Sequence, residues 1–203
     1  MNKIAVFDWG DVFITHPGWM SKMARYLRID DKRFRKFFFQ NLAPYGRGDI
    51  DDETWLALLA ENSPWDIDME EFSLFYQETY YDTMTLDEEM FEMFNEIKPV
   101  IGRSAVLSNT NSVAVDVISR KFPEFFYSFH RYFFSHEMGS VKPETPIYRD
   151  MLEALNAVPI LVDDRIENLP PARREGIYTL HFDRGVEDII PRTKAQLLQF
   201  FKS

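Results

Sequence analysis

Three short apolar runs, each ending at a polar residue, place the strongest constraint on how this chain can fold. They are residues 4–7 before Asp8, residues 104–107 before Ser108, and residues 160–162 before Asp163 and Asp164. Short, uninterrupted runs rich in β-branched side chains are typical of strands buried on both faces of a parallel sheet. Residues 132–134 and 177–182 are two further candidate strands.

Helical patterns separate these candidate strands, and several have a recognisable start. Thr145 followed by Pro146 is typical of a helix N-terminus, Asn111 or Ser112 is a candidate cap for another helix, and a last helix is expected over about residues 193–201. Strands and helices that alternate along the chain predict an α/β fold. We expect a Rossmann-like parallel sheet with helices on both faces.

The segment from residue 16 to residue 98 differs from the rest of the chain. It carries successive amphipathic helical patterns rich in aromatic side chains, which we interpret as core packing, and it has no convincing strand. This composition predicts a small helical bundle inserted after the first strand. The expected division is an α/β core of residues 1–15 and 99–203 and an inserted helical domain of residues 16–98.

Charge and composition exclude several classes of function. The formal net charge of −10 over 203 residues repels nucleic acid and anionic membranes, so neither is expected as a partner. A small phosphorylated metabolite can still bind where a cation, a lysine and backbone amides cluster. The chain has no cysteine, which excludes disulfides and thiolate chemistry. The first apolar run is too short for a signal peptide or a spanning helix, and we expect a cytoplasmic monomer or homodimer.

Polar side chains follow three candidate strands at the point where each strand ends. In an open parallel sheet, ligands bind at the carboxyl ends of the strands. If the three strands are neighbours, Asp8, Ser108, Asp163 and Asp164 meet in one small volume. Carboxylates that close together raise one another's pKa unless a cation compensates, and a hard divalent ion with oxygen ligands fits such a site. The sequence therefore predicts a magnesium site.

Lys142 lies in a loop, residues 139–143, just before the helix that is expected to begin near Pro146. From there a lysine can reach the same strand ends and set a positive charge beside a phosphate or a carboxylate. A nucleophilic carboxylate, a cation, a hydroxyl and an ammonium group together suit phosphoryl transfer.

Four segments in order resemble the four motifs of the haloacid-dehalogenase (HAD) superfamily. They are Phe7-Asp8-Trp9-Gly10-Asp11-Val12, Leu107-Ser108-Asn109-Thr110-Asn111, Val141-Lys142-Pro143 and Val162-Asp163-Asp164-Arg165-Ile166-Glu167-Asn168. The helical insertion between the first two is similar to the C1 cap of subfamily IA. Residues 47–53 resemble the cap of the subgroup that includes the bacterial α-glucose-1-phosphate phosphatase.

This resemblance implies a nucleophile and a metal site. Asp8 would attack phosphorus and become an aspartyl phosphate, which water then hydrolyses. Magnesium would bind the Asp8 carboxylate, the backbone carbonyl of Gly10 and Asp164. Asp163 would be a further ligand or would hold a bound water.

The same resemblance implies how phosphate is held. Ser108 and the amide of Asn109 would bind the phosphoryl oxygens, and Lys142 would neutralise charge on both the nucleophile and the phosphate. Asn168 and Asp11 would support the residues that contact the ligands. His16, which follows the first motif closely, and Tyr45 and Arg47 in the insertion are candidate substrate contacts.

Gly10 departs from the usual pattern of the superfamily. A second aspartate, acting as general acid and base, usually stands at that position, and losing such a group costs about 10²- to 10⁴-fold in rate. The subgroup that the chain resembles also has glycine there and includes active phosphatases. Leaving groups that depart easily, such as an anomeric sugar oxygen, would suffer least.

Each motif also has a simpler interpretation when taken alone. Asp8 could be a turn residue, Asp163 and Asp164 an N-cap pair, Ser108 a cap hydroxyl and Lys142 a surface lysine. Three functions are therefore compared. The first is a magnesium-dependent phosphohydrolase acting on a small phosphomonoester, for example a sugar phosphate. The second is a carbon-halogen hydrolase, which needs no magnesium. The third is a catalytically weak or inactive phosphate-binding protein.

Overall fold

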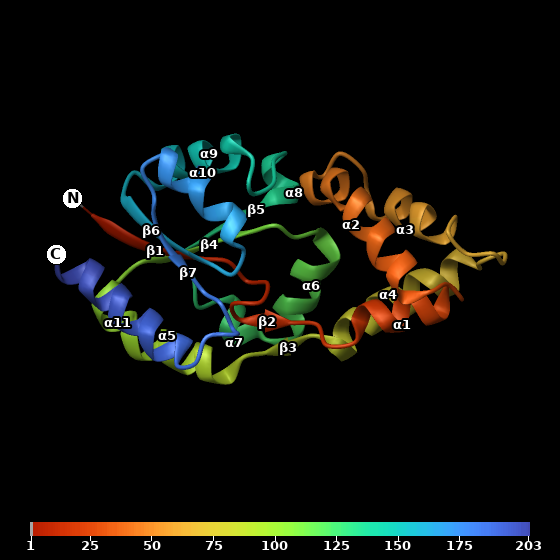
Figure 1. Cartoon of the computed structure of the whole chain (residues 1–203), viewed down its shortest axis with the longest axis horizontal. Coiled ribbons are helices and arrows are strands. Elements are labelled where there is room, and N and C mark those ends of the chain that lie inside the picture. Colours follow the sequence, from red (N-terminus) through yellow and green to blue (C-terminus); the bar gives the residue numbers. More distant parts are fainter. Residues whose placement is uncertain (1) are drawn as a thin grey trace.

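The computed structural model describes residues 2–203 and is built around a five-stranded parallel sheet (Figure 1). The strands run in the order β5-β4-β1-β6-β7. Their bounds are β1 Lys3–Phe7, β4 Ser104–Ser108, β5 Arg131–Phe134, β6 Val158–Asp163 and β7 Tyr178–His181. The chain places β4 and β5 on one side of β1 and then returns to place β6 and β7 on the other. The carboxyl end of β1 is therefore the topological switch point, where ligands of open α/β sheets bind.

Helices cover both faces of this sheet, as the apolar runs predicted. Phe7 and Val106 face one cluster of buried side chains, with Leu197 of α11, whereas Val6 and Leu107 face a second cluster on the other side of the sheet. The helices of the core are α5 Glu88–Ile101, α6 Ser112–Lys121, α7 Pro123–Phe126, α8 Ser135–Met138, α9 Thr145–Leu155, α10 Leu169–Arg174 and α11 Ile189–Lys202, with a 3₁₀ turn at Ile166–Asn168. This arrangement is the α/β fold that the sequence predicted.

Four helices form a separate body at one end of the molecule (Figure 1). They are α1 Trp19–Tyr26, α2 Asp31–Arg47, α3 Asp52–Ala60 and α4 Met69–Thr83. Three of them begin at an aspartate whose side chain accepts hydrogen bonds from the first turn, at Asp30, Asp51 and Asp68. Their aromatic stripes meet inside this body, where Trp55 stacks on Tyr45 with ring centroids 4.9 Å apart.

Two short strands connect the helical body to the core. Strand β2 Ile14–Thr15 pairs antiparallel with β3 Thr85–Leu86, so the chain leaves and re-enters the core at adjacent points. No strand was expected in residues 16–98, and that expectation is wrong for β3. A two-residue strand is too short to show any alternation of apolar and polar side chains.

Helix α5 packs on the sheet and not in the helical body. Phe94 of α5 contacts Phe7 of β1 with ring centroids 5.4 Å apart, and α5 lies alongside α11. The sequence had assigned residues 88–98 to the insertion, because an amphipathic stripe does not reveal which partner it packs against. The last helix likewise begins at Ile189, earlier than the expected residue 193.

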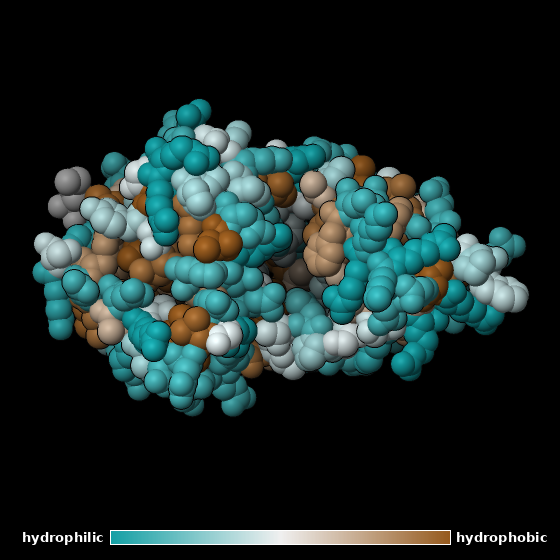
Figure 2. Space-filling model, viewed as in Figure 1, coloured by the Kyte–Doolittle hydropathy of each residue, from teal (hydrophilic) through white to brown (hydrophobic). Residues whose placement is uncertain are grey.

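The helical body touches the core again at the end of α2, so that a hollow lies between the two parts (Figure 2). Gly48 follows α2 with φ +76°, and a Cβ there would stand 2.3 Å from the carbonyl oxygen of His136. This close approach requires glycine. Arg47 Nη1 also lies 2.6 Å from Glu144 Oε1 of the core. Within residues 2–203, no helix has the length and apolar character needed to cross a membrane.

Candidate active site

Three acidic side chains converge at the carboxyl ends of β1 and β6. Phe7 pairs in register with Val162, so Asp8 and Asp163 leave neighbouring strands at the same level. Each of Asp8, Asp163 and Asp164 offers a carboxylate oxygen, and these three oxygens all lie within 4.8 Å of one another. The convergence of acidic side chains that the sequence predicted is therefore present in the structure.

Lys142 lies between two of these carboxylates. Its Nζ is 2.8 Å from Asp8 Oδ2 and 2.6 Å from Asp163 Oδ2, and its side chain is fully buried. Burial alone would lower the pKa of Lys142, but Asp163 and Asp8 more than offset it, so the pKa is raised and the ammonium stays charged. Burial raises the pKa of Asp8, which Lys142 and a hydrogen bond from Ser108 partly offset.

Asn109 fixes the loop that carries this lysine. Its Nδ2 donates to the Lys142 carbonyl oxygen at 2.7 Å, and its Oδ1 accepts from the Lys142 backbone N–H at 2.7 Å. The amide side chain therefore holds the lysine backbone on both sides. This role was not predicted, since only the backbone amide of Asn109 had been assigned a part.

Asp163 uses both of its carboxylate oxygens inside the protein. Oδ2 accepts from Lys142 at 2.6 Å, while Oδ1 accepts from Asn168 Nδ2 at 2.8 Å and from the Arg165 backbone N–H at 2.9 Å. Asn168 is buried and supports Asp163 through this hydrogen bond. Asp163 is thus positioned chiefly to hold the lysine.

Asp164 is the carboxylate left over for a cation. Burial, together with the charges of Asp8, Asp163 and Asp11, raises the pKa of Asp164 to about 7. With all three strand-end carboxylates ionised, the site carries three negative charges and the one positive charge of Lys142, a net charge of −2. A divalent cation with oxygen ligands matches this charge and this donor set.

The candidate backbone ligand is in the loop after β1. Gly10 carries no side chain there, and its carbonyl oxygen accepts one hydrogen bond, from Val12 N at 2.7 Å, which leaves a second lone pair. Asp11 adopts a left-handed conformation with φ 51° and lies close enough to raise the pKa of Asp164. Asp11 thus lies near Asp164, and its supporting role stays a prediction.

Arg184, which the sequence did not single out, holds this loop in place. Its Nε donates to the Asp11 carbonyl oxygen at 2.6 Å and its Nη2 to the Val12 carbonyl oxygen at 2.9 Å. Its Nη1 pairs with Asp87 Oδ2 at 2.6 Å, at the start of α5. No short motif marks an arginine that acts from so far along the chain.

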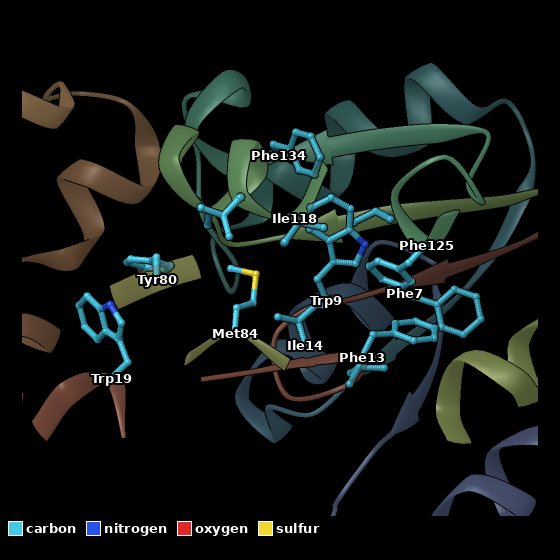
Figure 3. Packing of buried hydrophobic residues seen from close by; sticks show 14 of the residues in the cluster. Phe7, Trp9, Phe13, Ile14, Trp19, Tyr80, Met84, Ile118, Phe125 and Phe134 are labelled. Carbon is cyan, nitrogen blue, oxygen red and sulfur yellow. The ribbon is translucent and has the colours of Figure 1, made fainter. Parts of the chain in front are cut away.

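A cavity of about 520 Å³ lies between Lys142 and the helical body. Its sheet-side lining includes Gly10, Asp11, Ser108, Asn109 and Lys142. On the opposite side, Trp19 and Tyr80 pack together with ring centroids 4.9 Å apart, and Figure 3 shows this pair on the far side of Ile14 and Met84 from Phe7 and Phe13.

The three candidate substrate contacts have different outcomes. His16 lines the cavity, and burial lowers its pKa to about 4, so the ring is neutral near pH 7. Tyr45 and Arg47 do not line it, and the expectation for them is wrong. Tyr45 is buried against Trp55 with its hydroxyl donating to Asp52 at 2.7 Å, and Arg47 pairs with Asp49 and Glu144. Spacing alone does not say which side of α2 faces the core.

Solved structures with the same fold belong to HAD enzymes. A HAD family enzyme from Bacteroides thetaiotaomicron, in complex with magnesium and inorganic phosphate, is 17% identical with a TM-score of 0.74, covering 93% of this chain and 98% of that one. A predicted HAD-like family hydrolase from Porphyromonas gingivalis is 20% identical with a TM-score of 0.76, covering 97% and 98%.

A dehalogenase shares the fold as well. The L-2-haloacid dehalogenase from Xanthobacter autotrophicus, with chloropropionic acid covalently bound, is 16% identical with a TM-score of 0.69, covering 100% of this chain and 87% of that one. No family model matches the sequence. The chain therefore has the HAD fold.

Proposed function

We propose that this chain is a magnesium-dependent phosphohydrolase of the HAD superfamily, with Asp8 as the nucleophile. The observation that carries the proposal is the convergence of three carboxylates within 4.8 Å of one another, two of which contact the buried Lys142. The fold and the magnesium and phosphate bound to the enzyme from Bacteroides thetaiotaomicron support it. The helical body of α1–α4 would act as the cap that excludes water from the site.

Asp8, Asp164 and the Gly10 carbonyl would hold the metal ion. Once bound, magnesium supplies positive charge that offsets the carboxylates and the incoming phosphate dianion. Asp163 is the weaker candidate ligand, because both of its oxygens already accept hydrogen bonds. Its part is to keep Lys142 in contact with Asp8.

Hydrolysis would proceed in two displacements at phosphorus. A carboxylate oxygen of Asp8 attacks phosphorus, and the leaving group departs with the electrons of its P–O bond. Lys142, which contacts Asp8, stabilises negative charge on the transferring phosphoryl group. Ser108, which donates a hydrogen bond to Asp8, would donate to a phosphoryl oxygen. Water then attacks the phosphorus of the aspartyl phosphate and releases free phosphate, which regenerates Asp8.

Carbon-halogen hydrolysis is the competing reaction on this fold, given the dehalogenase from Xanthobacter autotrophicus. A halocarboxylic acid brings one negative charge and no cation to a site whose net charge is already −2. That charge favours a reaction with a divalent ion and a phosphate, and it disfavours dehalogenation.

Phosphate release from p-nitrophenyl phosphate tests the proposal. Purified protein with magnesium should turn over, chelation should stop it, and Asp8→Asn should lower the rate at least about 10³-fold, since the nucleophile is lost. Dechlorination of chloropropionate without magnesium would support the dehalogenase instead. Binding of magnesium and phosphate with no turnover of any phosphoester would indicate the inactive phosphate-binding protein.

A further inference from the structure

The helical body presents an apolar wall to the cavity. The side chains that α1 and α2 contribute to the lining are Trp19, Met20, Phe38, Phe39, Leu42 and Ala43. The ionised groups in the lining are Asp11, Lys142 and Arg165, and all of them come from the sheet side. The phosphate and the rest of the substrate would therefore meet opposite environments.

The buried polar atoms of the lining that lack a partner are ring nitrogens. Among the described residues, Trp9 Nε1, His16 Nδ1 and Trp19 Nε1 are buried without a hydrogen-bond partner, and all three residues line the cavity. A sugar carries several hydroxyls, and each one buried without a partner weakens binding. His16 is neutral near pH 7 and offers no charge for a second anionic group.

The loop after the nucleophile gives an independent indication. Gly10 offers no side chain to act as a general acid, and a Cβ built there meets no atom within 4 Å. Lys142 is engaged by Asp8 and Asp163. A leaving group that departs well without a strong general acid fits this site best, and phenols are far better leaving groups than alkyl alcohols or the primary hydroxyl of a sugar.

We propose that the substrate is a small aryl phosphomonoester, with its ring against the apolar wall formed by Trp19, Met20, Phe38, Phe39, Leu42 and Ala43. This inference rests on the proposed phosphohydrolase function. A bond forms between an Asp8 carboxylate oxygen and phosphorus while the bond from phosphorus to the aryl oxygen breaks, and the phenolate leaves with the electron pair. Water then cleaves the aspartyl phosphate, giving phosphate and a proton.

Substrate comparison is the first test. With magnesium, kcat/KM for phenyl phosphate should exceed that for hexose phosphates at least about 100-fold. Burial of an apolar ring against the wall stabilises the complex, whereas burial of sugar hydroxyls without partners destabilises it. Equal or better turnover of a hexose phosphate would overturn the aryl assignment while leaving the phosphohydrolase intact. Faster turnover of a phosphotyrosine peptide would overturn the assignment to a small molecule.

Variants of the apolar wall are tested by the ratio of two activities, because a loss of folded protein lowers both activities equally and leaves their ratio unchanged. Leu42→Asp should lower the ratio of kcat/KM for phenyl phosphate to that for acetyl phosphate at least about tenfold, since acetyl phosphate is too small to reach the wall. Phe39→Ser, at a side chain that is 58% exposed, should lower the same ratio. Leu74→Asp is the matched control on α4, because Leu74 is 58% exposed and outside the cavity lining. A ratio that both wall variants leave unchanged would overturn the inference.

A binding measurement separates this inference from the proposed function. Benzylphosphonate mimics phenyl phosphate but cannot be hydrolysed, and methylphosphonate lacks the ring. In calorimetry with magnesium, benzylphosphonate should bind at least about tenfold more tightly, and Leu42→Asp should remove the difference. Equal affinities would overturn the aryl site even in an active phosphatase, whereas a clear preference without turnover of any phosphoester would overturn only the hydrolase.

Discussion

Asn109 clamps the backbone of Lys142 from both sides, with its Nδ2 and Oδ1 each 2.7 Å from the Lys142 carbonyl oxygen and N–H. The residue after β4 thereby fixes the loop that delivers the lysine to β1 and β6. Two segments 33 residues apart are joined through one amide group.

Replacing that amide should loosen the lysine without removing it. Asn109→Ala loses two hydrogen bonds, so we expect a loss of about 1–3 kcal/mol in the free energy of unfolding and a fall in kcat of about 10²-fold as Lys142 shifts. Urea unfolding and phosphatase kinetics measure the two effects. Asn41→Ala, which removes one hydrogen bond to Phe37 of α2, is the control and should leave kcat unaltered. Equal kcat values for the two variants would contradict the clamp.

Removing the lysine should leave the repulsion between the Asp8 and Asp163 carboxylates uncompensated. Lys142→Met leaves Asp8 and Asp163 buried without their cation, and we expect a loss of about 3–5 kcal/mol in metal-free buffer. Magnesium should restore part of this stability, because it supplies positive charge to the same carboxylates. Thermal unfolding with and without magnesium measures both effects. A variant as stable as wild type in metal-free buffer would contradict buried ion pairs between Lys142 and the carboxylates of Asp8 and Asp163.

Asp164 should make magnesium binding depend on pH. Its folded pKa of about 7 lies above the ordinary value of 3.8, so its contribution to stability is full below about pH 4 and is lost as pH rises through about 7. Magnesium must displace this proton, so its apparent Kd should weaken about tenfold for each pH unit below 7. Titration calorimetry across pH measures this slope. The variant Asp164→Asn should bind magnesium weakly, and its Kd should depend less steeply on pH. A slope identical to that of the wild type would show that the displaced proton comes from another group.

Arg184 should act through the loop that it holds. Arg184→Gln removes charged hydrogen bonds to the carbonyl oxygens of Asp11 and Val12, so the neighbouring Gly10 carbonyl is held less firmly. We expect weaker magnesium binding and a fall in kcat of about tenfold or more. Arg174→Gln changes an exposed arginine outside the cavity lining and should alter neither. Faster amide exchange of residues 9–13 would accompany the effect of Arg184→Gln, and unchanged magnesium affinity would contradict it.

The sheet and the centre of the site could be predicted because both depend on local patterns. A strand buried on both faces needs an apolar run, and a parallel sheet brings the residues after such runs to one edge. Asp8, Asp163 and Asp164 follow from that rule alone, without knowledge of any distance, whereas Lys142 was predicted from its place in the loop before the helix that begins near Pro146.

The remainder depends on contacts between distant segments. The apolar face of α5 could pack equally well against other helices or against the sheet. Only the three-dimensional structure shows that Phe94 packs against Phe7 of β1. The side of α2 that lines the cavity excludes Arg47 and includes Leu42, a choice set by where the end of α2 meets the core. Arg184 reaches its loop across most of the chain, beyond any motif.

Covalent phosphoryl transfer to Asp8 is tested most directly by trapping the aspartyl phosphate. Rapid acid quench of a single turnover with a radiolabelled aryl phosphoester and magnesium should leave label on the peptide that contains Asp8, with none when magnesium is chelated or in Asp8→Asn. Product formation with no label on protein at any time, or label on another residue, would contradict the account.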